Sequence, residues 1–186
     1  YAMPVIGGLL ADRYLGMRKS VVFGGLLLVL GHLGMAVEGE QARLVGDTVV
    51  RDDRALQVFY FSLALIVVGV GFLKPNISTI VGRLYGIDDP RRDAGFTIFY
   101  MGINLGALTA TLVCGYLGVT YGWGYGFGVA GIGMLFGLVT FLHGQKHLRG
   151  HAEPPVPERL REPALPGLNK EWAIYLGAGA GVVAAW

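Results

Sequence analysis

A lysine, Lys74, stands inside the otherwise apolar stretch VGVGFLKPNIS, which runs from Val68 to Ser78. If this stretch crosses a bilayer, a charge at its centre costs at least about 2.5–3.5 kcal/mol, so the side chain normally faces a partner or a water-filled cavity. Pro75 follows the lysine and removes a backbone donor, which tends to kink a helix and frees a carbonyl that protein or water must satisfy. Both features direct Lys74 toward the interior of a helical bundle and predict a functional cavity there.

Other polar side chains are expected at a similar depth. Lys74, Asn104 and Tyr1 each lie nine to eleven residues from a charge in the next loop, about 14–17 Å along a helix. The hydrocarbon core is about 30 Å thick, so all three are expected near its midplane. Tyr100 lies one helical turn before Asn104, and Asn76 lies two residues after Lys74. The sequence therefore groups five polar side chains near the middle of the membrane.

Each of these positions also has a structural interpretation. The structural alternative for Lys74 is a salt bridge to a carboxylate on another span, but this chain has no acidic residue at that depth, so such a partner would lie outside it. Asn104 would also fit as a hydrogen-bonding link between helices. His32, about 18 Å into the membrane by helix rise, is more often a hydrogen-bonded core histidine than a proton carrier. Lys74 is therefore the residue that most strongly favours a functional cavity.

The elements that must position these side chains are membrane spans. Of the 186 residues, 53% are hydrophobic and 15% are charged, against about a quarter charged in a soluble domain. The runs 20–37, 55–73 and 94–142 contain no charge, and each crossing needs about 20 apolar residues. A single cysteine, Cys114, excludes a disulfide framework and a cysteine metal site. The composition predicts an all-α polytopic membrane protein.

Glycines and interfacial aromatics in residues 120–125 divide the longest apolar run into two spans. Because both ends of the chain fall inside apolar runs, we expect it to be a fragment of a larger protein. The predicted spans are a truncated first one at residues 1–11, then 20–37, 56–82, 94–118 and 126–142, and a last one that begins near Trp172.

The basic residues predict the orientation of these spans. Residues 13–19, 83–93 and 144–170 hold 11 of the 15 lysines and arginines, whereas the connections on the opposite side hold three. Cytoplasmic loops carry an excess of basic residues. The three basic segments are therefore predicted to be cytoplasmic, in a multi-pass protein of the plasma (inner) membrane.

The connection at residues 143–169 holds five of the eight prolines among mixed charges. This composition predicts an extended surface connection and favours a passive tether.

Glycines recur at a spacing of four, which lets helix backbones approach closely in lipid. We expect close packing at Gly102 and Gly106, at Gly118, Gly122 and Gly126, at Gly133 and Gly137, and at Gly177 and Gly181.

Several stretches resemble known transporter signatures. GGLLADRYLGMRKS (7–20) is similar to the loop between the second and third helices of the major facilitator superfamily. GFLKPNIS (71–78) and RRDAGFTIFYMGINLGAL (91–108) resemble the fourth- and fifth-helix signatures of the proton-dependent oligopeptide transporters, the POT or PTR family. YAMPVIGG (1–8) and GQKHL (144–148) are similar to its second helix and to the end of its sixth. Together these resemblances extend from residue 1 to about residue 150.

The resemblance implies a major facilitator fold of twelve or more helices in two halves, of which this chain would cover part of helix two to helix six. Residues 1–143 would form the N-terminal bundle without its first helix, and residues 144–170 a cytoplasmic linker. Residues 171–186 would begin either helix seven or an inserted helix. The whole protein would function as a monomer that includes the missing C-terminal half.

The resemblance also implies roles for the midplane residues. Lys74 looks like the lysine that engages the peptide carboxylate and couples to proton movement. Asn104 looks like the asparagine that hydrogen-bonds the peptide backbone, and Tyr1 like a pocket tyrosine. Tyr100 and Asn76 are included in the same peptide-binding group on account of their positions.

Asp12, Arg13 and Arg18 resemble a cytoplasmic latch that holds one conformation of the alternating-access cycle. The implied function is proton-coupled symport of di- and tripeptides, with the proton gradient as energy source and no cofactor, metal or nucleic-acid partner.

Three alternatives remain. A major facilitator porter of nitrate or an organic anion would keep the fold, and Lys74 would serve it equally well. A membrane enzyme is disfavoured, because His143, His147 and His151 lie in or beside the linker without a metal-site pattern. A receptor or assembly subunit would bind its ligand without proton-coupled uptake.

Overall fold

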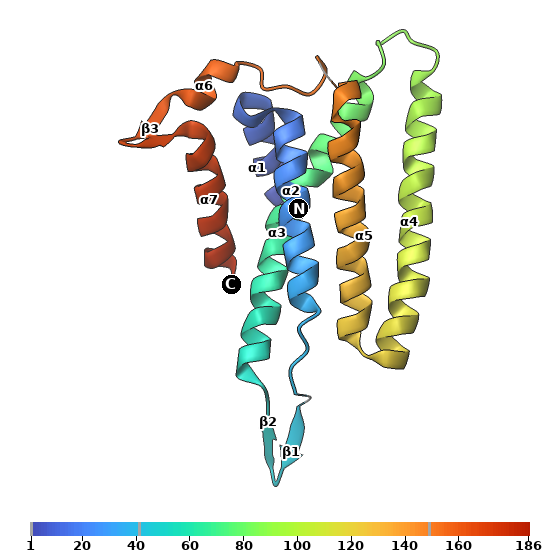
Figure 1. The fold of residues 1–186 in the computed structure, drawn as a ribbon, viewed down its shortest axis with the longest axis vertical. Coiled ribbons are helices and arrows are strands. Elements are labelled where there is room, and N and C mark those ends of the chain that lie inside the picture. Colours follow the sequence, from blue (N-terminus) through green and yellow to red (C-terminus); the bar gives the residue numbers. More distant parts are fainter. Residues whose placement is uncertain (1, 41, 149) are drawn as a thin grey trace.

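The structure, a computed structural model, describes residues 2–40, 42–148 and 150–186 and consists mainly of helices (Figure 1). The helical segments are α1 (Ala2–Leu10), the π-helical turn η1 (Ala11–Leu15), α2 (Gly16–Met35), α3 (Asp53–Arg83), α4 (Arg92–Tyr121), α5 (Trp123–Gly144), the 3-10 turn η2 (Gln145–Leu148), α6 (Pro157–Arg161) and α7 (Lys170–Ala185). The strands form two antiparallel hairpins, β1 (Arg43–Val45) with β2 (Thr48–Val50) and β3 (Pro163–Leu165) with β4 (Leu168–Asn169).

Four helical stretches in the described part of the chain are long and apolar enough to cross a membrane. They are Ala2–Met35, Asp53–Arg83, Arg92–Tyr121 and Trp123–Leu148. Gly16, with φ +73°, divides the first of them into α1 and α2, and Gly122, with φ +118°, separates α4 from α5. The predicted polytopic helical class is therefore confirmed, with the bounds of α2 to α5 within about four residues of the expected spans.

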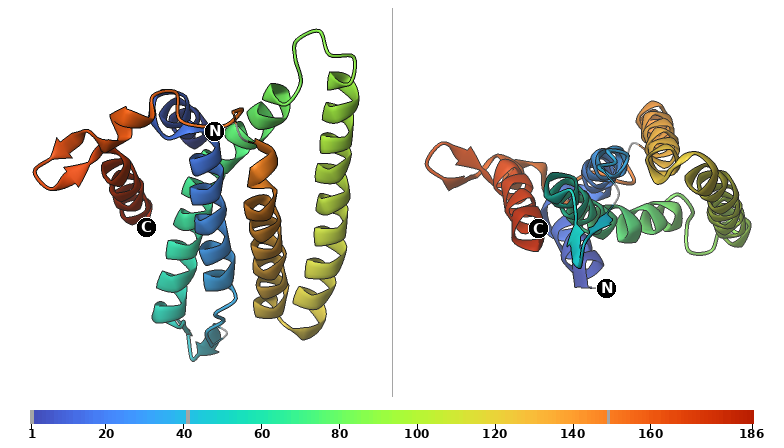
Figure 2. Two further views of the ribbon diagram at one scale, coloured as in Figure 1. Left: turned by 45° about the horizontal axis from the view of Figure 1, so that its top comes forward. Right: turned by 90° about the horizontal axis from the view of Figure 1, so that it is seen from below.

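Helix α3 is the centre of the array. It packs against α1, α2 and α7, whereas α5 packs against α2, and α4 packs mainly against α5. Figure 2 shows the consequence, with α4 at one edge of the array and α7 at the other. The predicted cytoplasmic segments, residues 13–19, 83–93 and 144–170, gather at one end, and the β1–β2 hairpin and the α4–α5 turn lie at the opposite end (Figure 1).

Glycines bring α2 and α3 into close contact. A side-chain carbon on Gly24 would lie 2.6 Å from the carbonyl oxygen of Gly69, and one on Gly69 would lie 2.9 Å from the carbonyl oxygen of Gly24. Neither backbone can yield, so both positions require the absence of a side chain. Buried Val68 and Phe72 extend the same α3 surface into the core.

The glycine prediction is only partly correct. A side-chain carbon on Gly126 would lie 2.7 Å from the carbonyl oxygen of Cys114, as close packing of α4 and α5 requires. The other predicted pairs, however, have open space among the described residues, because no described element packs on their faces. These are Gly102 and Gly106, Gly133 and Gly137, and Gly177 and Gly181.

The linker differs from the extended tether that its proline content predicted. It contains η2, the short helix α6 and the β3–β4 hairpin. Ala152 is fully buried and Leu160 is 2% exposed. A few apolar residues at intervals along the linker pack it against the helices. The average composition of the linker does not reveal where these residues lie.

Candidate functional site

The site begins at the proline in α3. Pro75 cannot donate to the carbonyl of Gly71, one turn before it. Helix α1 covers this position, since a side-chain carbon on Gly7 would overlap with the carbonyl oxygen of Gly71 and one on Gly8 would touch the Pro75 ring. Glycines on α1 therefore allow that helix to approach the irregular turn of α3 that carries Lys74.

Lys74 and Asn76 occupy different environments on this turn. Lys74 is exposed and makes no ion pair with any described residue. Asn76 is 2% exposed, and its side-chain Nδ2 donates to the carbonyl oxygen of Phe72 at 2.7 Å. The lysine side chain is thus exposed among the described residues, whereas the asparagine amide is directed into the packed side of α3.

The second pair of predicted site residues lies on α4. Asn104 is exposed, and its Nδ2 donates to the carbonyl oxygen of Tyr100 at 2.9 Å. Tyr100 is 55% exposed and lies against the rings of Phe96 and Phe99. Both polar side chains are therefore accessible on the surface of α4.

The structure does not bring the two pairs together. Helix α4 meets the end of α3 near its own start, where the ring of Phe96 approaches Gly82, and beyond this point it stands away from α3 (Figure 2). The fifth predicted residue, Tyr1, lies outside the described residues.

The predicted latch residues lie at the turn between α1 and α2. Asp12 and Arg13 belong to η1 and are exposed, and Arg18 is half-buried at the start of α2. The π-helical turn holds one more residue than an α-helical turn, a feature frequent at functional sites. Gly16 then reverses the chain with a positive φ that side chains rarely adopt.

Sequence inspection missed the partner of Arg18. Its guanidinium lies 3.8 Å from the carboxylate of Glu153, and its backbone N–H donates to the carbonyl oxygen of Ala152 at 3.0 Å. Both partners belong to the linker, more than a hundred residues further along the chain. A local motif contains no signal for such a contact.

His32 is placed as a structural histidine would be. Its Nδ1 lies 2.7 Å from the carbonyl oxygen of Leu28, one turn earlier in α2, and the residue is partly exposed.

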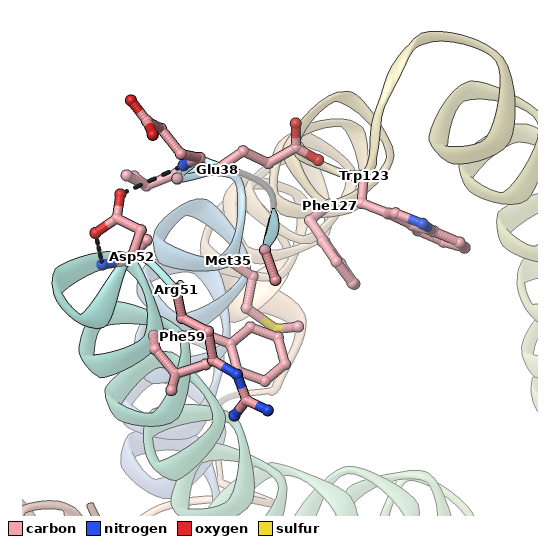
Figure 3. A pocket seen from close by; sticks show the side chains of 13 residues that line it. Met35, Glu38, Arg51, Asp52, Phe59, Trp123 and Phe127 are labelled. Atoms are coloured by element: carbon pink, nitrogen blue, oxygen red, sulfur yellow. Dashed lines mark hydrogen bonds between the residues drawn. The ribbon is translucent and has the colours of Figure 1, made fainter. Parts of the chain in front are cut away.

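A cavity of about 780 Å³ lies elsewhere, between the end of α2 and the starts of α3 and α5 (Figure 3). Met35, Phe59 and Phe127 line it, and none of the predicted site residues does. Above it, the Glu38 carboxylate accepts a hydrogen bond from the backbone N–H of Gly124 at the start of α5, a favourable place for an anion. This cavity is at the end of the array opposite the latch.

Two loop carboxylates have lowered pKa values. The backbone N–H of Ala55, and then that of Glu40, lower the pKa of Asp52, which caps the start of α3. The side chain of Arg91 and its backbone N–H lower the pKa of Asp89 to about 2. Both groups therefore remain ionised near neutral pH.

Long apolar helices with their basic connections at one end (Figure 1), and a lysine beside a proline in the central helix, define a polytopic helical membrane protein. The POT family model matches residues 18–157, and the chain belongs to this family. Its helices form part of a major facilitator fold.

Two curated relatives are similar over most of the chain. It is 43% identical over 184 residues to the uncharacterized transporter YclF of Bacillus subtilis (strain 168), covering 99% of this chain and 33% of the relative. It is 41% identical over 165 residues to the di-/tripeptide transporter of Lactobacillus helveticus, covering 83% of this chain and 30% of the relative.

Solved structures agree with this assignment. The crystal structure of a peptide transporter POT in complex with alafosfalin matches with a TM-score of 0.72 and 45% identity, over 99% of this chain and 34% of that one. The chain therefore spans about a third of the length of the relatives it matches.

Proposed function

We propose that the protein is a proton-coupled symporter of di- and tripeptides that works by alternating access, and that this chain contributes part of the N-terminal half of the peptide cavity. Its membership of the POT family and the peptide substrates named for its relatives support the proposal. The single observation that carries it is the accessible ammonium group of Lys74, beside a proline in an apolar helix of membrane-spanning length.

In this proposal the polar side chains of the site replace the interactions with water that a peptide zwitterion loses when it leaves solution. Lys74 pairs with the peptide carboxylate, because a charge-assisted hydrogen bond is about twice as strong as a neutral one. Asn104, Tyr100 and Tyr1 satisfy the peptide bond and polar side chains, which would be costly to bury unpaired. A direct contact from Asn76 would require its amide to leave the Phe72 carbonyl.

The same lysine is proposed to couple transport to protons. A titratable group that pairs with either the substrate or another charged residue links peptide binding to proton movement. Asp12, Arg13 and Arg18 are proposed as the latch that stabilises one state of the cycle.

The assembly and location follow from the same proposal. The whole protein is expected to act as a monomer in the plasma membrane, with residues 13–19, 83–93 and 144–170 in the cytoplasm. It moves solutes and carries out no covalent chemistry.

Uptake of a labelled dipeptide into liposomes under an inward proton gradient tests the proposal. We expect the full-length wild type to accumulate the dipeptide and Lys74→Ala to abolish accumulation, because the carboxylate then has no cation to pair with. Lys146→Ala removes an exposed lysine of η2, beyond the end of α5, and should leave uptake unchanged.

The alternatives predict different results. A folded wild type without dipeptide uptake would overturn the peptide proposal and favour a porter of nitrate or an organic anion. Undiminished uptake by Lys74→Ala would keep the substrate and assign the lysine a structural role.

A further inference from the structure

Residues 151–160 lie across the turn that joins α1 to α2, and are called the strap below. The backbone of Ala152 accepts a hydrogen bond from the N–H of Arg18 at 3.0 Å, and Ala152 itself is fully buried. The strap therefore contacts the predicted latch through its backbone. Substitution of exposed side chains would not remove this backbone hydrogen bond.

Gly16 shows how closely the strap fits. A side-chain carbon at this residue would overlap with the backbone nitrogen of Pro154 and lie 2.6 Å from the carbonyl carbon of Glu153. Both atoms belong to backbone and cannot rotate away. The contact therefore depends on glycine at position 16 for space as well as for its positive φ.

Apolar side chains anchor both ends of the contact. Ala152 packs in one cluster with Met17 and Val21 of α2. Leu160, which is 2% exposed, belongs to a second cluster with Leu15 of η1 and Phe72 of α3. The strap thus contributes to apolar clusters that also contain residues of the latch turn and of α3.

Charged groups converge beneath the strap. A cavity of about 50 Å³ is lined by Asp12, Arg83 and Glu153, together with Gly16 and Pro155. Burial opposes ionisation of Glu153, but the backbone N–H of Ala152 and other backbone N–H groups outweigh it and lower the pKa of the carboxyl group. Its anion faces the guanidinium of Arg18 at 3.8 Å.

We propose that the strap holds the latch turn in one conformation, and that Ala152 and Glu153 are positioning residues for Arg18 during the transport cycle. The inference deepens the proposed function and rests on it, because the latch acts only in a protein that alternates between states. Loosening the strap changes the rate of interconversion and leaves the peptide cavity intact.

The first test compares Gly16→Ala with Gly46→Ala in the full-length protein. Gly46 also has a positive φ, +63°, but a side-chain carbon there meets no described atom within 4 Å. Both substitutions strain the backbone, and only the first displaces the strap. We expect Gly16→Ala to raise hydrogen–deuterium exchange in peptides that contain Arg18 and to lower the maximal uptake rate at least fivefold. Peptide affinity should stay within twofold, and Gly46→Ala should behave as wild type.

A second test uses charge-exchange variants, so that the proposal remains testable if Gly16→Ala does not fold. Arg18→Glu and Glu153→Arg each place like charges together, and the double variant restores opposite charges with the positions exchanged. We expect each single variant to lower the maximal rate several-fold and the double variant to recover at least half of it. Glu162→Arg, which disrupts the ion pair with Lys170 at the β3–β4 hairpin, is the matched control and should leave the rate unchanged.

Several results would overturn the proposal. These are faster exchange at Arg18 with an unchanged maximal rate, slower uptake with unchanged exchange, or no recovery in a folded double variant. Absence of dipeptide uptake by wild type would instead overturn the proposed function. Exchange in Gly16→Ala needs no substrate, so unchanged exchange would still show that the strap does not hold the turn.

Discussion

Two asparagines make the same local hydrogen bond in different environments. Asn76 and Asn104 each donate from Nδ2 to the carbonyl four residues earlier, but Asn76 is buried on α3 and Asn104 is exposed on α4. Residue type and spacing made both candidates for peptide binding. Burial separates them, since only Asn104 is exposed among the described residues.

We predict different effects of alanine at these positions. Asn76→Ala should lower the free energy of unfolding by about 1–2 kcal/mol, because it removes a buried hydrogen bond and leaves a small cavity. Asn104→Ala should change stability by less than about 0.5 kcal/mol but raise KM for a dipeptide several-fold. Unfolding in detergent and liposome uptake measure the two effects. A raised KM at unchanged stability for Asn76→Ala would show a direct substrate contact there.

Asp89 gives a prediction for pH dependence. Because Arg91 lowers its pKa to about 2, below the unfolded value near 3.8, its contribution to loop stability is present above about pH 4 and lost as the pH falls through 2. Its charge is thus constant between about pH 5 and 8. We expect Asp89→Asn to leave the pH profile of dipeptide uptake unchanged, and a shifted optimum would contradict this assignment.

At the scale of elements, the interface of α2 and α3 depends on two glycines that meet backbone to backbone. Elsewhere glycines with the same spacing of four face no described helix, as at Gly133 and Gly137 on α5. Spacing therefore indicates which helices can approach closely, and only the arrangement of helices shows where they do.

We predict that Gly24→Ala destabilises the protein, because its added carbon would lie 2.6 Å from the Gly69 carbonyl oxygen and 2.7 Å from the Leu73 nitrogen. Forcing the helices apart should cost about 1–3 kcal/mol, measurable as a lower Tm in detergent. Gly137→Ala, which meets no described atom within 4 Å, should not lower Tm. Equal effects of the two substitutions would argue against the interface.

At the scale of the whole molecule, the connections separate into two groups at opposite ends of the array (Figure 1). The basic segments 13–19, 83–93 and 144–170 share one end, as the charge pattern predicted. The strap could connect to the latch only because the linker and the α1–α2 turn lie on the same side.

Cysteine labelling on intact cells tests this arrangement. In a full-length background from which Cys114 and any other cysteine have been removed, Asp47→Cys in the β1–β2 turn should react with a membrane-impermeant maleimide, and Asp88→Cys before α4 should not. Both positions are exposed, so accessibility differs only by side. Inverted vesicles should reverse the result, and labelling of both positions from one side would contradict the topology.

The sequence by itself determined the class, the spans and the family. Lipid cannot hydrogen-bond the backbone, so long uncharged runs must become helices, and the motifs around Lys74 and Asn104 are local. These features depend on residues close together in the chain, which is why the bounds of α2 to α5 and the break at Gly122 were predictable.

Tertiary structure alone decided which distant segments meet. The docking of Ala152 and Glu153 on the α1–α2 turn, the Glu38 contact with α5 and the burial of Asn76 involve partners that no local pattern connects. The physical reason is that a helix can bury any of several faces, and the choice depends on the summed packing of all its neighbours.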